Sequence, residues 1–305
     1  MEKVTVDKSG ALVVSYPEPQ LLIGVEEKLV PEYPDDRMVT HWHEDIELVL
    51  ALDGGLKSRV DAQEIELSAG DVLFINSQRL HQHYDDVPSS SAMAIRFHPS
   101  LILSGLPKNS LARKILRDTG FRWRVLKAGT ENAERTAQIM RQLQTVLRER
   151  KTLYELDAAM LAVQLIKEIC IVCRKEPPSP GNFREENHEK VRGIMSYIYR
   201  NFSRKISLDD ISGAEEMNRS KCCRLFTYFT NETPVDFLNA YRLETSARLL
   251  SGTNRTLKDI TAACGFADQS YFGRMFRGKY RCSPGKYRKA ASARYEELKL
   301  WKPKR

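Results

Sequence analysis

Several features are scarce in the sequence or absent from it, and each excludes a class of protein. The 305 residues include only six cysteines, and their spacing does not form the pattern of a disulfide framework. The most apolar stretch, residues 158–173, is interrupted by Gln164, Lys167 and Glu168, so it is too short and too polar to span a bilayer. The first residues are charged and lack the apolar segment of a secretory signal. We therefore expect a cytoplasmic protein with no membrane partner.

The composition is otherwise that of a folded protein, with 42% hydrophobic and 29% charged residues, and the length predicts two domains. The formal net charge of +8 is unevenly distributed. Residues 1–180 contain 23 Lys and Arg against 26 Asp and Glu, whereas residues 181–305 contain 25 against 14, so the net charges are −3 and +11. A basic excess confined to one part of a chain indicates a nucleic acid or another anionic partner for that part.

A proline-rich segment divides the sequence. Residues 174–187 contain three prolines, a glycine and a run of charges, which predicts a linker over 176–187. Before it, alternating segments predict strands over about 1–103, and helical spacing predicts helices over about 132–173. After it, the pattern is helical. We therefore expect an α+β multidomain protein with a strand-rich domain and packed helices over 1–175, an all-α domain over 188–292 and a basic tail over 293–305.

The clearest strand and turn signals lie near residue 50. In residues 46–52 every second residue is isoleucine or leucine, which predicts a strand, and Asp53-Gly54-Gly55 predicts a β-hairpin. Val72-Leu73-Phe74-Ile75 predicts a further, buried strand. In 132–173, two apolar stripes at helical spacing predict two amphipathic helices, which could cover a face of the sheet or pair with another copy of the protein.

The basic part contains an internal repeat with a period of about 50 residues. Residues 207–211 (SLDDI) correspond to residues 256–260 (TLKDI), and Thr233-Pro234 corresponds to Ser283-Pro284. Each copy begins with a capping-box pattern and predicts a short helix, a turn and a second helix. This is the helix-turn-helix unit, whose second helix enters the major groove of DNA. A connecting helix over about 235–251 would be roughly 25 Å long. This length is of the same order as one turn of DNA, about 34 Å, so the helix could hold the two second helices in successive major grooves.

A longer signature lies in the second copy. The sequence from Gly265 to Arg277 reads GFADQSYFGRMFR, and Tyr280, Ser283-Pro284 and Tyr287-Arg288 follow it. This signature resembles that of the AraC/XylS family of bacterial transcription regulators, and the resemblance covers residues 190–290 without gaps. It implies an all-α domain with two helix-turn-helix motifs, with double-stranded promoter DNA and RNA polymerase as partners. One departure is Gly213, which costs about 1 kcal/mol of helix propensity relative to alanine and predicts a looser first motif.

In that family, residues near the start of each second helix contact bases. Carried over, the resemblance implies base contacts by Ser220, Lys221, Cys223 and Arg224 in the first motif and by Gln269, Ser270, Tyr271 and Arg274 in the second. Arginine bonds bidentately to guanine and glutamine to adenine, so Arg224, Arg274 and Gln269 are expected to specify the sequence. Arg277 and Lys279 are expected to contact phosphates. The alternative for the two base-reading arginines is a surface salt bridge.

Five of the six histidines lie in the acidic part, at positions 41, 43, 81, 83 and 98. The spacing His41-x-His43-x3-Glu47 places three side chains on one face of a strand, because odd positions share a face. Farther on, Gly70-x5-Asn76 leads to His81. These two segments resemble the two motifs of the cupin barrel, whose histidines and glutamate hold a metal ion. The resemblance implies a cupin-like β-barrel over about 1–103.

These four side chains, His41, His43, Glu47 and His81, admit three interpretations. Three imidazoles and a carboxylate suit iron, manganese, nickel or zinc. However, Asn76 and Gln78 stand where the second cupin motif usually has proline and glycine, and regulators that resemble this sequence usually lack the metal. We therefore favour a polar lining for a small-molecule effector pocket, with no cofactor and no metal. A purely structural or interdomain role is the third interpretation.

Together these patterns predict a one-component transcription regulator. A small-molecule effector would bind the cupin-like domain and change which DNA arrangement the protein prefers. The helices over 132–173 are candidates for a homodimer contact, which would add avidity. The alternative is a metal-dependent cupin enzyme, an oxygenase or isomerase, fused to a DNA-binding module. We expect no enzyme, because the metal motif is incomplete and the sequence lacks GxSxG, P-loop, HExxH and dinucleotide motifs.

Overall fold

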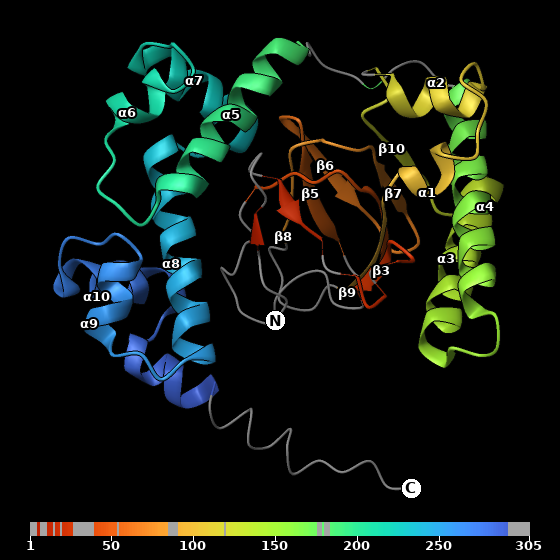
Figure 1. The fold of residues 1–305 in the computed structure, drawn as a ribbon. Helices are drawn as coiled ribbons and strands as arrows, with labels where there is room; N and C mark the ends of the chain where they lie inside the picture. Colours follow the sequence, from red (N-terminus) through yellow and green to blue (C-terminus); the bar gives the residue numbers. More distant parts are fainter. Residues whose placement is uncertain are drawn as a thin grey trace, which may run out of the picture. The chain divides into compact units, whose positions relative to one another are not determined.

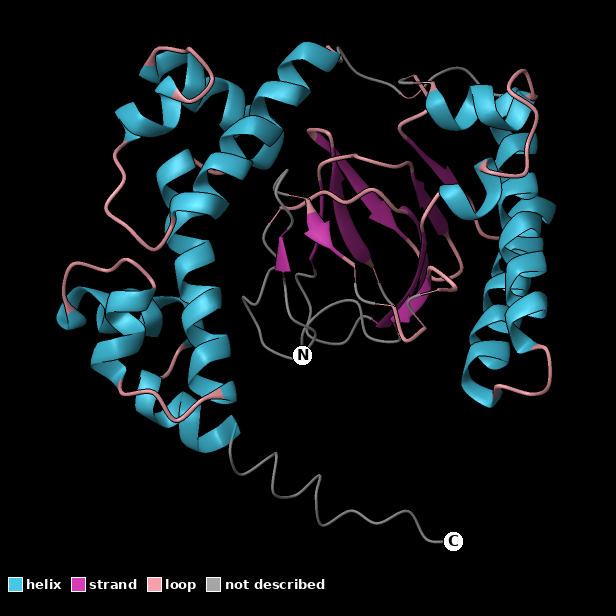
Figure 2. Cartoon of the chain, in the orientation of Figure 1, coloured by secondary structure: helices cyan, strands magenta, loops and turns pink. Residues whose placement is uncertain are grey.

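The computed structural model describes residues 5–6, 11–14, 16–18, 20–26, 40–53, 55–84, 91–118, 120–175, 179 and 184–291. The chain forms two compact units, the first ending at Glu189 and the second beginning at Lys190. The strands drawn in Figure 2 all belong to the first unit, and the second unit consists of helices. The predicted basic tail over 293–305 lies outside the described residues. Within the described residues, no helix is long and apolar enough to cross a membrane.

Two antiparallel sheets pack face to face in the first unit and form the predicted barrel (Figure 1). The five-stranded sheet has the order β10-β7-β4-β9-β3, the three-stranded sheet has the order β6-β5-β8, and β1 pairs with β2. The strands are β1 (Thr5–Val6), β2 (Leu12–Val13), β3 (Ile23–Glu26), β4 (Ile46–Asp53), β5 (Leu56–Val60), β6 (Gln63–Leu67), β7 (Val72–Ile75), β8 (His81–Tyr84), β9 (Ser91–Phe97) and β10 (Trp123–Leu126).

Strand β4 contributes to a hydrophobic core on each of its faces. Ile46, Leu48 and Leu50 join the core between the five-stranded sheet and the helices. Val49 and Ala51 join the core between the two sheets. Side chains on a strand alternate between faces, so the odd-numbered face of β4 points to the inside of the barrel. Glu47 lies on that inner face, and this placement determines the site described below.

Four helices cover the outer face of the five-stranded sheet. Figure 1 shows α3 and α4 side by side along it. Thr130 caps α3 by accepting a hydrogen bond from the Ala133 N–H, and Arg150 ends the helix in the left-handed conformation. The two helices confirm the two apolar stripes predicted over 132–173. The four helices are α1 (Ser100–Leu103), α2 (Leu111–Arg117), α3 (Glu131–Glu149) and α4 (Tyr154–Lys175).

The structure corrects two local predictions. The hairpin predicted at Asp53-Gly54-Gly55 is wrong, because β4 pairs with β7 and β9 whereas β5 pairs with β6 and β8 in the other sheet. The chain therefore passes from one sheet to the other between the end of β4 and the start of β5. Residues 41–47 do not form one continuous strand either: Glu47 lies in β4, and His41 forms an isolated bridge with His81.

The segment predicted as a linker over 176–187 contacts the barrel at a described residue. Ser179 is buried, and its hydroxyl accepts hydrogen bonds from the N–H groups of Arg122 and Trp123. Helix α5 (Glu185–Asn201) begins before the predicted end of the linker. Its first turn therefore belongs to the first unit and the rest of the helix to the second.

Among the described residues, the second unit contains the rest of α5, a last helical stretch over 284–291 and five helices between them. These five helices form two helix-turn-helix motifs joined by a 19-residue helix of about 28 Å, close to the length expected from the sequence. The aromatic residues Phe266, Phe272 and Phe276 are buried in the core of the second motif. The helices are α6 (Leu208–Gly213) and α7 (Arg219–Thr230), the connecting α8 (Pro234–Gly252), and α9 (Leu257–Ala263) and α10 (Gln269–Tyr280).

Candidate DNA-binding surface and buried histidine cluster

Local hydrogen bonds determine where each helix of the two motifs begins. Ser207 caps α6 in a reciprocal capping box with Asp210, as the sequence predicts. The second helices, α7 and α10, are capped by Asn218 and Asp268, whose side chains accept from the N–H groups three residues later. Thr233 caps α8, with Pro234 at its first position. The caps therefore fix the register of the residues that each second helix presents.

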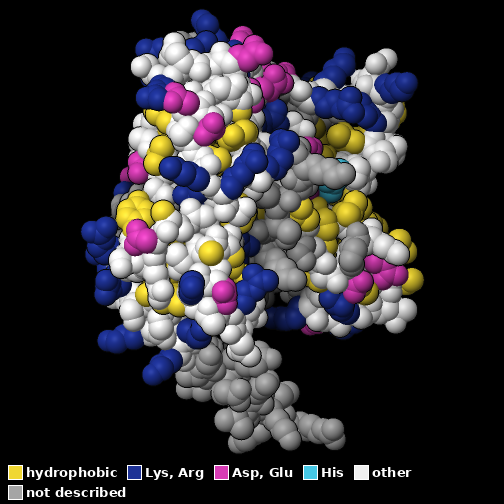
Figure 3. Space-filling view, turned by 60° about the vertical axis from the view of Figure 1, so that its left-hand side comes forward, with side chains coloured by type: hydrophobic (Ala, Val, Ile, Leu, Met, Phe, Trp, Pro, Cys, Tyr) yellow, Lys and Arg dark blue, Asp and Glu magenta, His cyan; other side chains and the backbone are white. Residues whose placement is uncertain are grey.

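The ten predicted DNA contacts all lie on α7 or α10. Eight are exposed: Ser220, Lys221, Arg224, Gln269, Ser270, Tyr271, Arg274 and Arg277. Cys223 and Lys279 are half-buried. Figure 3 shows Lys and Arg side chains spread over the visible face of the second unit. Each motif thus presents a polar and basic helix surface of the kind that enters a major groove.

The arginines that are expected to read bases are available for that role. Among the described residues, neither Arg224 nor Arg274 forms an ion pair, so the alternative of a surface salt bridge is not seen there. The guanidinium of Arg274 lies 6.0 Å from the centre of the Tyr271 ring. Lys279 is different, because its Nζ lies 3.2 Å from the carboxylate of Glu244 on α8. We therefore leave Lys279 out of the interface proposed below.

The turn of the second motif depends on a glycine. Gly265 has a φ of +72°, and a Cβ at this position would lie 2.3 Å from the carbonyl oxygen of Phe202 and 2.9 Å from Nη2 of Arg242. Gly213 of the first motif is in open space, with nothing within 4 Å of a Cβ. The two glycines therefore respond differently to the same substitution.

We expect Gly265→Ala to lower the free energy of unfolding of the second unit by about 2 kcal/mol or more, because it combines a disfavoured φ with a steric clash. Gly213→Ala should raise it by up to about 1 kcal/mol through helix propensity. Thermal and urea unfolding of the full chain would measure both values. An unfolding midpoint unchanged by Gly265→Ala would contradict this description of the turn.

Inside the barrel, four imidazoles surround one carboxylate. Glu47 Oε2 lies 3.0 Å from Nε2 of His43 and 3.2 Å from Nε2 of His81, and its Oε1 lies 3.2 Å from Nε2 of His83. The ring of His41 is centred 4.3 Å from that of His81. All five side chains are buried, with exposed fractions of 1–6%. We call these five residues the histidine cluster.

The hydrogen bonds behind the rings determine which nitrogens face Glu47. Nδ1 of His43 lies 3.1 Å from the carbonyl oxygen of Asp45, and Nδ1 of His81 lies 2.8 Å from that of Arg79. A carbonyl and a carboxylate both only accept, whereas a neutral imidazole carries one N–H. A neutral ring therefore cannot donate to both partners, and one of its two contacts places a lone pair against an acceptor. Nδ1 of His83 is paired with the Ser58 hydroxyl at 2.8 Å.

The pKa values follow from this burial. Desolvation lowers the pKa of His43 to about 4, although the hydrogen bond to Glu47 opposes the shift, so this ring is neutral at pH 7. Desolvation likewise lowers the pKa of His83. Burial alone would raise the pKa of Glu47, but the imidazoles of the cluster outweigh it and hold the pKa well below its usual value. The cluster thus places an ionised carboxylate beside the neutral ring of His43.

This arrangement fits a divalent transition metal ion. Lone pairs on neighbouring acceptors repel one another unless a cation or a proton lies between them. Two donor sets have their ligand atoms within 4.8 Å of one another, namely His41 with His43 and His81, and Glu47 with His81 and His83. Ligands bound at about 2.0–2.2 Å to one metal lie roughly 3.0–3.5 Å apart, which matches the distances to Glu47. Imidazole ligands whose Nδ1 donates to a carbonyl are the usual pattern at such sites.

The structure brings together the four side chains that the sequence selects and adds a fifth. His83 was not among the predicted site residues, although it lies two positions after His81, where a strand presents the same face. His98 lies apart, paired with Ser100. The two departures from the second cupin motif have local roles: Asn76 donates to the carbonyls of Leu116 and Phe121, and Gln78 occupies the left-handed region at φ +63°.

Comparisons with known proteins agree with both parts of this description. A helix-turn-helix domain family matches residues 211–290, and a cupin domain family matches residues 33–92. The chain is 24% identical over 293 residues to the uncharacterised HTH-type transcriptional regulator YdeC of Bacillus subtilis, covering 96% of this chain and 100% of that protein. It is 22% identical to the HTH-type transcriptional activator RhaS of Escherichia fergusonii, covering 91% of this chain and 96% of that protein.

Among solved structures, the chain is similar to ToxT of Vibrio cholerae bound to an unsaturated fatty acid, with a TM-score of 0.44 and 15% identity over 87% of this chain and 93% of that one. The fold and the two sites define a DNA-binding protein with a cupin barrel and two helix-turn-helix motifs. In both parts the chain is similar to AraC-type transcriptional regulators.

Proposed function

We propose that the protein regulates transcription by binding promoter DNA through both motifs, with α7 and α10 in successive major grooves, and that a ligand of the histidine cluster modulates this binding. Arg224 and Arg274 would contact guanine and Gln269 adenine, each from an exposed position in the first half of its helix. Arg277 would contact phosphate. The observation that supports the DNA-binding part is the pair of capped, exposed second helices of the repeat.

For the ligand, we propose a divalent transition metal ion in preference to an organic effector. The observation that carries this proposal is the convergence of several imidazole nitrogens on one buried carboxylate, while Nδ1 of His43 and of His81 lies within hydrogen-bond distance of a carbonyl oxygen. The residues that would hold the ion are His41, His43, Glu47, His81 and His83. A bound ion would supply positive charge between these lone pairs. Asp45, Arg79 and Ser58 would orient the rings.

The metal content of the purified full chain tests the proposed ligand. Elemental analysis should find about one transition metal ion per chain, removed by a chelator and restored by adding zinc or manganese. His81→Ala should lose the ion, and His98→Ala, which changes a histidine outside the cluster, should keep it. DNA binding should differ between the metal-loaded and chelated protein. Metal-free protein whose DNA binding responds to a small organic molecule instead would overturn this choice of ligand.

A cupin enzyme is the second candidate for the first unit, since the cluster resembles the metal centre of cupin oxygenases and isomerases. The matched relatives are named as transcriptional regulators. Substrate must reach the metal in such an enzyme, and exposed fractions of 1–6% leave the five side chains enclosed. The burial of the cluster therefore favours a sensing role over catalysis. The resulting change in DNA binding would alter transcription by RNA polymerase at the promoter.

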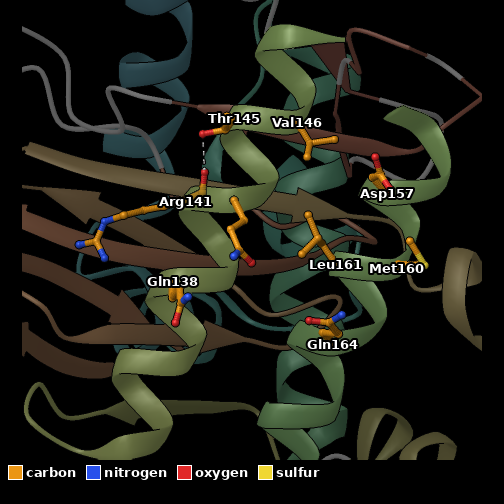
Figure 4. Close-up of a pocket in the computed structure, with 9 residues that line it drawn as sticks. Gln138, Arg141, Thr145, Val146, Asp157, Met160, Leu161 and Gln164 are labelled. Atoms are coloured by element: carbon orange, nitrogen blue, oxygen red, sulfur yellow. Dashed lines mark hydrogen bonds between the residues drawn. The ribbon is translucent and has the colours of Figure 1, made fainter. Parts of the chain in front are cut away.

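We further propose that α3 and α4 form a homodimer contact. Three exposed residues of α4 follow the 4-3 spacing of a coiled-coil seam, namely Leu156, Met160 and Val163, each 50–57% exposed. Leu153, in the turn before α4, is also exposed. Beside them lies a groove of about 640 Å³ between α3 and α4. Figure 4 shows it lined by Val146 of α3 and by Met160 and Leu161 of α4.

Met160→Glu should therefore weaken self-association about tenfold or more, because it places a charge in the centre of an apolar seam. Sedimentation of the full chain at micromolar concentrations, with and without DNA, would measure this change. Leu111→Glu is the matched control, since Leu111 is 51% exposed on α2 and outside the seam. A wild-type protein that sediments as a monomer under both conditions would contradict the proposed dimer.

A further inference from the structure

A second buried charged group lies next to the histidine cluster. Asp61, between β5 and β6, is 2% exposed. Its Oδ1 accepts a hydrogen bond from the Leu80 N–H at 3.1 Å and lies 3.0 Å from Nε2 of His188. Its Oδ2 lies 3.8 Å from Arg79 and 3.7 Å from Arg122. The carboxylate therefore joins the end of β5, the start of β8 and the first turn of α5.

Three consecutive residues connect this carboxylate to the histidine cluster. Arg79 reaches Asp61 and also Glu185, whose carboxylate lies 3.4 Å away. Leu80 donates to Asp61 and accepts from its N–H at 2.9 Å. His81 is a member of the cluster, and its Nδ1 donates to the Arg79 carbonyl. Residues 79–81 thus touch the cluster on one side and the beginning of α5 on the other.

Helix α5 is held at both of its ends. His188, fully buried, anchors its first turn to Asp61 within the first unit. Near its other end Tyr199 packs in the second unit, with its ring 4.7 Å from that of Tyr241 and 5.7 Å from that of Phe237 on α8. The same helix is therefore part of the core that supports the DNA-binding motifs.

We propose that Asp61, residues 79–81 and His188 form a coupling element that transmits ligand binding at the histidine cluster to α5. The inference rests on the proposed ligand-binding function of the cluster. A movement of the His81 ring acts on the peptide group between Arg79 and Leu80, because the ring donates to the carbonyl of that group. The N–H of the same peptide group donates to Asp61. Leu80 and Arg79 both contact Asp61, which contacts His188. A buried carboxylate that loses its hydrogen-bond and ion-pair partners is destabilised by its full desolvation cost. A change at the histidine cluster is therefore accompanied by a change at the first turn of α5.

Hydrogen exchange of the full chain tests this coupling with the ion alone as the probe. Zinc should slow exchange in the peptide spanning residues 184–192 about threefold or more in the wild type. In His188→Ala, zinc affinity measured by competition with a chromophoric chelator should stay within about twofold of wild type, while the response of residues 184–192 disappears. His188→Gln retains an amide that can reach Asp61 and should restore the response. Asp61→Asn keeps the side-chain volume and is a second uncoupling variant, should His188→Ala fold poorly.

A metal-independent arm separates failure of the coupling from failure of the proposed ligand. Glu47→Gln alters the cluster directly, and it should change exchange at residues 184–192 in the wild-type background but not in Asp61→Asn. If this occurs in a protein that does not bind zinc, the coupling is supported and the choice of ligand is wrong. If neither zinc nor Glu47→Gln changes exchange at residues 184–192, or if zinc still does so in both uncoupling variants, the coupling element is contradicted.

Discussion

Arg274→Ala is expected to abolish the preference of the protein for its specific DNA site while leaving weak binding to unrelated DNA. Arg274 is exposed on α10 and forms no ion pair among the described residues, so its guanidinium is available to a base edge. A bidentate contact with guanine gives about 1–3 kcal/mol of discrimination, or about 5- to 150-fold in relative affinity. Non-specific affinity depends on phosphate contacts, which this substitution leaves in place.

The measurement requires a specific fragment, which genome-wide mapping of binding sites in the native host would supply. Affinities for this fragment and for a scrambled one would be compared at several salt concentrations. Arg277→Ala is the matched control, and it should weaken binding to both fragments alike. It should also reduce the slope of the logarithm of the binding constant against the logarithm of the salt concentration by about 1 in magnitude. Arg224→Ala should reduce discrimination at the half of the site read by the first motif. A footprint that survives Arg274→Ala would contradict the assignment.

The features predicted best from the sequence are those that depend on neighbouring residues. The capping box of Ser207 with Asp210 and the pair Thr233-Pro234 each act within one helical turn, and the structure has α6 and α8 beginning where these residues predict. The repeat then identified both motifs, because each copy encodes the same local signals. The exposed positions of α7 and α10 follow directly from helical spacing.

The features that the sequence did not predict depend on contacts between distant segments. Asp53-Gly54-Gly55 has hairpin chemistry, but the partners of β4 lie in β7 and β9, which no local signal indicates. Glu47 and His83 lie in different sheets and meet only when the two sheets pack face to face. The contact between Asp61 and His188 joins residues far apart in the chain, so spacing could not have suggested it. Because side chains two residues apart on a strand share a face, His83 could have been predicted as a site residue once His81 had been selected.

Glu47→Gln is expected to remove the effect of metal on the stability of the first unit without destabilising the metal-free protein. In the absence of metal, a neutral ring whose proton is used at Nδ1 presents a lone pair to the carboxylate, whereas an amide can donate its N–H to that ring. With metal, the wild type should gain about 2.7 kcal/mol at a ligand concentration one hundred times Kd, because the ion binds only the folded state. For a unit of this size that gain corresponds to an increase in Tm of roughly 5–10 °C.

Thermal unfolding would give the Tm of the wild type and of Glu47→Gln, each measured in chelator and in excess zinc. Glu44→Gln is the matched control, because Glu44 accepts from the side chain of Gln78 outside the cluster and the zinc-dependent increase in Tm should persist there. The direction of the change in Tm that Glu47→Gln causes in chelator distinguishes a structural role of the cluster from a metal-binding role. A purely structural ion-pair cluster would lose stability when Glu47 loses its charge, since protonated imidazoles would then be buried without a counter-ion. A metal site should instead have an unchanged or higher Tm in chelator and no response to zinc, because the repulsion between the carboxylate and the lone pairs is gone.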